Sequence, residues 1–202
     1  AALLAALHRR APRPMLVVAR DAREAEALAQ DLHFFLGEEP TAEALRKRIH
    51  VLPAWDVAPF APVSPSPETI AQRIEGLYHL AQTPNPIVVT TPEAALQRVM
   101  APAALQGSVS YLVQGDEVDL VELARRLTEW GYKRRPLVED RGEFAVRGGL
   151  VDVFVTGVGD PLRLELVGDA LDSIRTFDPR SQRKIAEREE ALILPAAEFP
   201  AQ

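Results

Sequence analysis

Arginine and glutamate side chains on one predicted strand are the residues of this chain best suited to bind a partner. The segment 162–167 reads Leu-Arg-Leu-Glu-Leu-Val, and the two-residue period of a strand directs its three leucines to one face. Arg163, Glu165 and Val167 then lie together on the opposite face. Guanidinium groups form paired hydrogen bonds with carboxylates, so such a face is suited to an acidic partner.

A second predicted strand adds another arginine to the same kind of face. In the segment 144–147 the alternation directs Phe144 and Val146 inward and exposes Ala145 and Arg147. Antiparallel sheets commonly leave one face solvated, so an ordinary wet surface explains these residues as well as a partner surface does. The spacing alone leaves both interpretations open.

Enzyme chemistry has no support in the sequence. No glycine is followed by Lys, so the phosphate-binding pattern G-x-x-x-x-G-K-[ST] is absent. No serine lies in the G-x-S-x-G pattern of acyl-transfer enzymes. The histidines lie in separate elements without metal-ligand spacing: His8, His33, His50 and His79. We therefore expect no catalytic residue, no metal and no cofactor in this chain.

Two further features are weaker candidates for anion binding. Thr91 opens a predicted helix directly after a buried strand, where free N–H groups can hold a phosphate, but capping of its own helix is the favoured explanation. A cluster of cations is better explained by a solvated helix end than by a binding patch: Arg125, Arg126, Lys133, Arg134 and Arg135.

The composition is that of a folded protein without a strong preference for nucleic acid or membrane. The 202 residues are 47% hydrophobic and 26% charged, and a net charge of −6 disfavours a large nucleic-acid footprint. No apolar stretch approaches the roughly 20 residues of a membrane span. The absence of cysteine favours a reducing, cytoplasmic location. The chain begins without Met, in a segment typical of a helix interior, so we expect a piece of a longer protein.

The first half alternates strand and helix patterns, as parallel α/β proteins do. The apolar run Met15–Ala19 is typical of a strand buried on both faces. The predicted strands are 15–19, 49–52 and 87–90, and the predicted helices are 22–36, 68–80 and the segment after Thr91.

Two details of this half carry specific expectations. The last of these helices is expected to bury Leu96, Val99 and Met100 as one stripe. The segment between the second strand and its helix is expected to be a proline-rich loop that contains Trp55 and Phe60.

The pattern changes near residue 108. Asp119 caps a predicted helix that ends at Gly131, and short alternating strands separated by glycine turns follow it. The predicted strands are 143–147, 150–155, 162–167 and 171–177, with a last one at 191–194. We predict an α/β domain over residues 1–108 that is truncated at its start, an α+β domain with an antiparallel sheet over 109–195, and a return segment toward the first domain over 196–202.

Motifs along nearly the whole chain resemble the N-terminal, UvrB-like region of bacterial transcription-repair coupling factors. In the first half these motifs are Leu52–Asp56, Ser64–Pro67, Arg73–Leu77 and Thr91–Val99. In the second half they are Gly131–Tyr132, Gly142–Gly149, Phe177–Arg183 and Leu194–Pro200. Arg141–Gly148 is also similar to the R-G-x-F-x-V-R-G pattern of UvrB.

The resemblance implies a degenerate helicase-like, RecA-like parallel-sheet domain that carries an inserted α+β domain, and it implies that the inserted domain binds the excision-repair protein UvrA. The UvrA-contacting positions of the family match Arg147, Arg163 and Glu165, with Val167 where related proteins have an aromatic residue. The chain itself is then no enzyme. The implied parent is an ATP-driven DNA translocase that displaces stalled RNA polymerase, and its other domains bind ATP, magnesium, duplex DNA and the polymerase.

Departures from UvrB favour a coupling factor over UvrB, and two alternative functions stay open beside it. Ala145 stands where UvrB has a further arginine, and the segment Pro53–Pro67 lacks the tyrosines of the UvrB hairpin that holds damaged DNA. The alternatives are a truncated helicase-like ATPase, whose phosphate-binding loop precedes Ala1, and a UvrB-like fragment that binds damaged DNA. Salt-sensitive association with DNA would mark the second of these.

Overall fold

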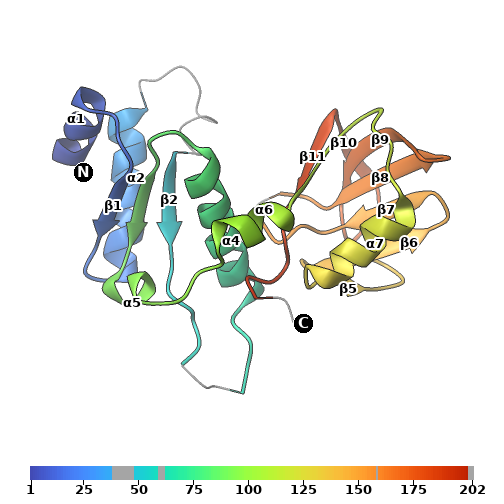
Figure 1. Ribbon diagram of the computed structural model, residues 1–202, viewed down its shortest axis with the longest axis horizontal. Helices are drawn as coiled ribbons and strands as arrows, with labels where there is room; N and C mark the ends of the chain where they lie inside the picture. The colour runs from blue at the N-terminus through green and yellow to red at the C-terminus, as the bar shows by residue number, and fades with distance from the viewer. Residues whose placement is uncertain (38–47, 59–61, 158, 200–202) are drawn as a thin grey trace. The chain divides into compact units, whose positions relative to one another are not determined.

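The chain folds into two compact units. The computed structural model describes residues 1–37, 48–58, 62–157 and 159–199 (Figure 1). Unit 1 comprises Ala1–Pro102 and unit 2 comprises Ala103–Gln202, whereas the sequence predicted a boundary near residue 108. Phe60 of the predicted proline-rich loop lies outside the described residues.

Unit 1 is a parallel three-stranded sheet with helices packed on it, as its alternating pattern predicted (Figure 1). Strand β3 is central, and both outer strands pair with it in parallel. The strands are β1 (Met15–Val18), β2 (Ile49–Leu52) and β3 (Ile87–Thr90). The helices are α1 (Ala2–Arg10), α2 (Ala22–Leu36), α4 (Pro67–Gln82) and α5 (Pro92–Ala95). Helix α2 packs against α1, β2 and β3, and α4 packs against β2 and β3.

Side-chain caps fix where the two long helices of unit 1 begin. Asp21 accepts a hydrogen bond from the N–H of Glu24 at 2.9 Å and caps α2, as predicted. The Glu24 carboxylate accepts from the N–H of Arg20 at 2.8 Å, one residue before the cap. Ser66 caps α4 by accepting from the N–H of Thr69 at 3.2 Å.

Strand β1 is not buried on both faces, contrary to the prediction. Met15 and Val17 pack into the core with α1 and α2, but Leu16 and Val18 are exposed. The reason is that β1 lies at the edge of the sheet, while α4 packs against β2 and β3. A short apolar run does not reveal whether its strand is central or at an edge.

The helix after Thr91 is also shorter than predicted. Thr91 accepts from the N–H of Ala94 at 3.3 Å and caps its own helix, but α5 is a single turn. Leu96 is 87% exposed and Val99 is exposed as well, so the predicted buried stripe is wrong for these two residues. Met100 is buried, as expected.

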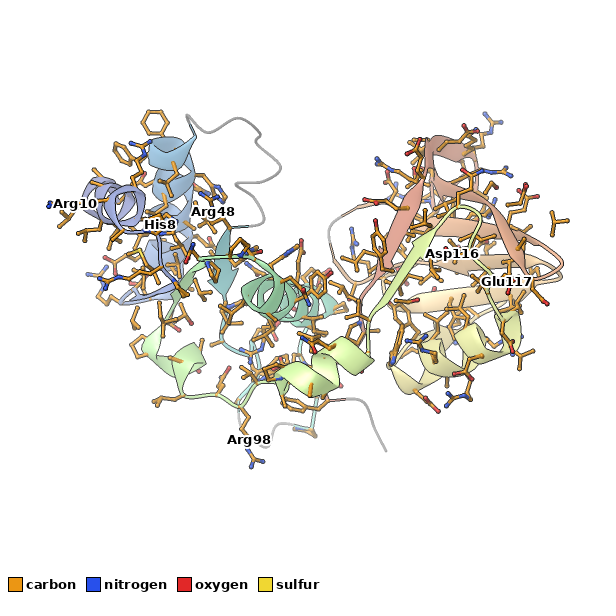
Figure 2. The ribbon with its side chains drawn as sticks, turned by 45° about the horizontal axis from the view of Figure 1, so that its top comes forward. His8, Arg10, Arg48, Arg98, Asp116 and Glu117 are labelled. Atoms are coloured by element: carbon orange, nitrogen blue, oxygen red, sulfur yellow. The ribbon has the colours of Figure 1, made fainter. Side chains whose placement is uncertain are left out.

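A buried arginine holds the segment that follows α5. Arg73 in α4 is fully buried, and its guanidinium carbon lies 4.2 Å from the centre of the Trp55 ring. Its Nη1 donates to the Pro53 carbonyl at 2.7 Å and to Gln97 Oε1 at 3.3 Å. Its Nη2 donates to the Arg98 carbonyl at 3.2 Å, while the Arg98 side chain points outward (Figure 2). Three motifs singled out in the sequence therefore meet at one guanidinium group.

Unit 2 contains the predicted antiparallel meander within a six-stranded sheet (Figure 1). The strand order is β10-β9-β8-β7-β6-β5, antiparallel except that β5 pairs in parallel with β6. The strands are β5 (Lys133–Arg134), β6 (Glu143–Arg147), β7 (Leu150–Val153), β8 (Leu162–Val167), β9 (Ala170–Phe177) and β10 (Lys184–Arg188). The remaining elements are α6 (Pro102–Gly107), β4 (Ser110–Val113), α7 (Leu120–Glu129) and β11 (Glu190–Ile193), and β4 pairs with β11. Strands β4, β5 and β10 were not predicted.

Helix α7 and one face of this sheet form the core of unit 2. Asp119 caps the helix by accepting from the N–H of Val121 at 2.9 Å, as its position in the sequence predicted. Leu123, Leu127 and Trp130 are buried against the sheet. The opposite face of the sheet, here called the outer face, carries the predicted site residues.

The residues after β11 are tied to the end of α7. The Tyr132 hydroxyl donates to the Leu194 carbonyl at 2.6 Å, and burial raises the pKa of this phenol. The N–H groups of Ala196 and Ala197 point to the Trp130 carbonyl at 2.8 and 3.2 Å. The first residues of the predicted return segment thus hydrogen-bond within unit 2, and residues 200–202 lie outside the described part of the chain.

Candidate partner-binding site

Arg147, the first predicted site residue, is positioned by a glycine hairpin. It ends β6, and Gly148 follows it with φ +60°, a left-handed conformation that glycine adopts without strain. A Cβ atom at Gly149 would lie 2.6 Å from the Leu166 carbonyl oxygen. The chain can turn this tightly against β8 because both residues lack a side chain, and the turn fixes where Arg147 leaves the sheet.

A buried carboxylate joins Arg147 to Arg163. Asp152 in β7 is 1% exposed and lies opposite Arg163 in the register of β7 and β8. Its Oδ1 accepts from Arg163 Nε at 2.7 Å, and its Oδ2 accepts from Arg163 Nη2 at 2.9 Å and from Arg147 Nη2. The hydrogen bond to Asp152 raises the pKa of the Arg163 guanidinium above its ordinary value. We call these three residues the Asp152 clamp.

A second ion pair lies next to the clamp. Glu165 Oε2 in β8 accepts from Arg175 Nη2 and from Ser173 Oγ, the latter at 3.1 Å. Arg175 lies opposite Arg163 in the register of β8 and β9. Val167, at the end of β8, is 68% exposed and adds an apolar side chain beside these charges. All four predicted site residues therefore lie on the outer face, on β6 and β8.

Ala145 does not belong to the exposed surface, contrary to the prediction. It points to the outer face but is buried, because it packs in a small apolar cluster with Val138, Phe154 and Phe177. The alternation of side chains along a strand correctly predicted the direction of the Ala145 side chain. It could not show that the segment before β6 brings Val138 over that part of the sheet.

Arg147 offers donors that a partner can reach. Its side chain is 44% exposed, and its Nε and Nη1 form no hydrogen bond with any of the described residues. The Arg163 side chain is 19% exposed, and its Nε and Nη2 are both used by Asp152. An acidic group of a partner would therefore find free donors first on Arg147.

Sequence reasoning missed two members of this face, Asp152 and Arg175. Asp152 is the single charged residue in the apolar run 150–155, and a carboxylate in such a run was the available signal. A charge in an apolar strand needs a partner when it is buried, which points to an arginine on a neighbouring strand. Arg175 lies in β9, whose predicted span was close to the observed one.

Glu143 anchors the segment that covers the apolar end of the outer face. Its Oε2 accepts from the N–H groups of Glu139 at 3.2 Å and Asp140 at 3.1 Å, and its Oε1 accepts from Arg135 Nε at 3.1 Å. Burial alone would raise the pKa of Glu143, but these hydrogen bonds outweigh it and lower the pKa.

A Glu143→Gln variant is expected to lose the stability that this ionised carboxylate supplies. A lowered folded-state pKa stabilises the fold above the unfolded pKa, about 4.3, and the effect disappears as pH falls through the folded value. We expect the free energy of unfolding of the variant to be about 1 kcal/mol lower than that of the wild type at pH 7. This difference should shrink as the pH is lowered through the unfolded pKa and below it. Urea denaturation across that range measures it, and a difference that stays constant with pH would contradict the assignment.

Three of the other candidates from the sequence have local contacts: Arg125, His50 and His79. Arg125 pairs with Glu122 and Glu129 along α7, as expected for a solvated helix. His50 and His79 stack with ring centres 4.9 Å apart. Among residues 1–37, 48–58, 62–157 and 159–199, no group of three acidic, histidine or cysteine side chains is arranged to hold a metal ion. No helix in these ranges is long and apolar enough to cross a membrane.

Comparison with known proteins places the outer face in a described domain family. Residues 111–199 match the UvrB interaction domain, a span that contains every residue of the Asp152 clamp. Over 97% of its length the chain is 41% identical to a transcription-repair-coupling factor of Myxococcus xanthus. The chain is homologous to transcription-repair-coupling factors. This finding confirms the resemblance that the sequence motifs indicated.

Two further relatives of this family extend the comparison. The transcription-repair-coupling factors of Haemophilus influenzae and Escherichia coli are 34% and 30% identical to the chain, over 92% and 99% of its residues. The chain spans only 16%, 15% and 17% of the length of these three curated relatives. The alignments thus include almost the whole chain but only a small part of each relative.

Proposed function

We propose that the chain is a non-catalytic module of a transcription-coupled DNA-repair factor, and that unit 2 recruits UvrA through Arg147, Arg163, Glu165 and Val167. The observation that carries the proposal is the pairing of two arginines on the buried Asp152. This pairing holds the Arg163 guanidinium in a defined position and brings the more exposed Arg147 guanidinium beside it. The match to the UvrB interaction domain over the same residues supports the choice of partner.

The face also defines what UvrA should present. A carboxylate of UvrA would accept hydrogen bonds from Arg147, because Nε and Nη1 of this arginine have no acceptor among the described residues. Glu165, beside its ion pair with Arg175, would accept a hydrogen bond from a donor of UvrA. The exposed Val167 would pack against an apolar side chain of UvrA. A mixed apolar and charged contact of this kind is typical of recruitment interfaces.

The same proposal assigns unit 1 to a degenerate helicase-like, RecA-like fold that binds no nucleotide. In parallel α/β proteins, nucleotides commonly bind outside the carboxyl ends of the strands. Here Pro53 and Trp55, which follow the carboxyl end of β2, pack on the buried Arg73. We assign ATP, magnesium, duplex DNA and RNA polymerase to other domains of a longer protein, and a cytoplasmic location to the whole.

Calorimetric titration of the chain with UvrA tests the recruitment proposal. We expect Arg147→Ala and Arg163→Ala each to weaken binding at least tenfold, about 1.4 kcal/mol. Arg188→Ala is the matched control, because Arg188 is exposed on β10 and lies opposite Ile174, whose side chain is in the core. It should bind as the wild type does.

Other outcomes separate the proposal from its alternatives. Equal binding by wild type and both variants would place the UvrA surface elsewhere on the chain. No binding by the wild type would contradict recruitment and favour the truncated-motor interpretation, which predicts magnesium-dependent binding of a fluorescent nucleotide. A salt-sensitive shift of a lesion-containing duplex would favour UvrB-like damage binding.

A further inference from the structure

A compact turn follows β9, and the proposed face does not account for it. The Asp178 carboxylate accepts hydrogen bonds from the N–H groups of Arg180 at 3.0 Å and Ser181 at 2.6 Å. The N–H of Gln182 donates to the Asp178 carbonyl at 2.7 Å, and the N–H of Asp178 donates to the Arg183 carbonyl at 2.9 Å. These bonds close the turn on itself and fix the position of Gln182.

Gln182 has a backbone conformation that is unfavourable for its residue type. Its φ is +60°, and among the described residues Asn85 is the other non-glycine residue with a positive φ. Glycine would adopt this conformation with less strain. A glutamine here costs local energy, so the contacts of its side chain must offset that cost.

The side-chain amide of Gln182 forms three hydrogen bonds with its neighbours. Its Oε1 accepts from Arg163 Nη2 at 3.1 Å. Its Nε2 donates to the carbonyl groups of Pro179 at 2.8 Å and Val138 at 3.1 Å. The two donor bonds fix the direction of the amide, and this directs its oxygen to Arg163.

Arg163 is consequently held on three sides. Asp152 accepts from its Nε and Nη2. Gln182 accepts from the Nη2 through its side-chain Oε1 at 3.1 Å and, more weakly, from the Nη1 through its backbone carbonyl at 3.4 Å, which a glycine at this position would keep. The guanidinium carbon lies 4.4 Å from the centre of the buried Phe177 ring. Arg147 has only its bond to Asp152 within the described part of the chain, so the two arginines of the clamp are supported unequally.

We propose that Gln182 is a positioning residue of the partner-binding site, which holds the Arg163 guanidinium against Asp152 and Phe177 in the orientation that UvrA meets. The inference rests on the proposed recruitment of UvrA. A side chain that is ordered before binding loses less conformational entropy when the complex forms. Arg163 is thus the preordered arginine of the site, and Arg147 is the one that adapts to the partner.

A Gln182→Gly variant distinguishes the effect of the Gln182 side chain from that of the backbone turn. Glycine accepts the left-handed conformation, so the variant removes the amide without adding backbone strain. We expect UvrA binding to weaken about 3- to 10-fold, the cost of ordering one arginine during binding. Asn85→Gly gives the same backbone change at the other positive-φ position, in unit 1, and should leave UvrA binding unchanged.

A double-mutant cycle tests whether Gln182 acts through Arg163. In an Arg163→Ala background, Gln182→Gly should cause no further loss of affinity. In an Arg147→Ala background it should cause its full loss. A merely structural role of Gln182 would add the same loss in both backgrounds, and that result would overturn the inference.

Side-chain NMR of the free protein supplies a readout that does not need UvrA. The Arg163 Nε–H should show restricted motion in the wild type and clearly greater motion in Gln182→Gly, while Arg175 Nε–H stays unchanged. Unchanged motion at Arg163 would overturn the inference.

If Arg163→Ala weakens UvrA binding and Gln182→Gly does not, the inference fails and the proposed recruitment of UvrA stands. If Arg163→Ala has no effect on binding, the recruitment face itself is wrong.

Discussion

Asp152→Ala is expected to lower the free energy of unfolding of unit 2 by about 3 kcal/mol. The carboxylate is buried, and it accepts hydrogen bonds from two guanidinium groups on neighbouring strands. Its removal leaves Arg163 only partly exposed and without its main acceptor, beside the like charge of Arg147. Because Arg147 is considerably exposed, most of the loss should come from Arg163. Urea denaturation followed by Trp130 fluorescence, in a Trp55→Phe background, measures the change in unit 2.

Asp152→Asn is the matched variant for this prediction. It keeps the shape and one acceptor oxygen but removes the negative charge, so it should retain part of the stability that Asp152→Ala loses. Loss of less than about 0.5 kcal/mol in Asp152→Ala would instead be the behaviour of a surface ion pair. In that case the clamp would not hold its arginines in defined positions.

The directions of the site side chains were predictable because they depend only on local chain geometry. Because side chains alternate between the two faces along β8, Arg163 and Glu165 must lie on the same face, whatever surrounds the strand. The identity of their partners depends on register between strands: Asp152 meets Arg163 only because β7 and β8 pair as they do. No local pattern fixes that register, so the sequence could indicate that a buried Asp152 needs a cationic partner but could not show which arginines pair with it.

Two of the wrong predictions share a physical cause. Leu96 lies at helical spacing after Thr91, but α5 ends at Ala95, and the next residues are held by Arg73 on another helix. Ala145 points outward as predicted, but Val138 covers it. In both cases a long-range contact overrides a local pattern, and hydrophobic spacing carries no information about such contacts.

Arg73→Ala is expected to lower the free energy of unfolding of unit 1 by about 3–5 kcal/mol. The guanidinium is fully buried, donates to the Pro53 and Arg98 carbonyls and to Gln97 Oε1, and stacks on Trp55. Alanine would remove the Arg73 donors from the Pro53 and Arg98 carbonyls, while Gln97 Oε1 would keep the Trp55 backbone N–H at 2.9 Å, and it would open a cavity under the indole ring. Urea denaturation followed by Trp55 fluorescence, in a Trp130→Phe background, measures the loss.

Two further substitutions at Arg73 separate hydrogen bonding from packing. Lysine keeps the charge but cannot fork to two carbonyl groups and an amide, so we expect a loss of about 2 kcal/mol or more. Methionine fills much of the volume of the arginine side chain but has no hydrogen-bond donor.

If Arg73→Met is as unstable as Arg73→Ala, the hydrogen bonds of Arg73 hold the segments after β2 and α5 together. If Arg73→Met matches the wild type, packing alone stabilises unit 1, since a well-packed apolar side chain can replace a buried charge without loss of stability.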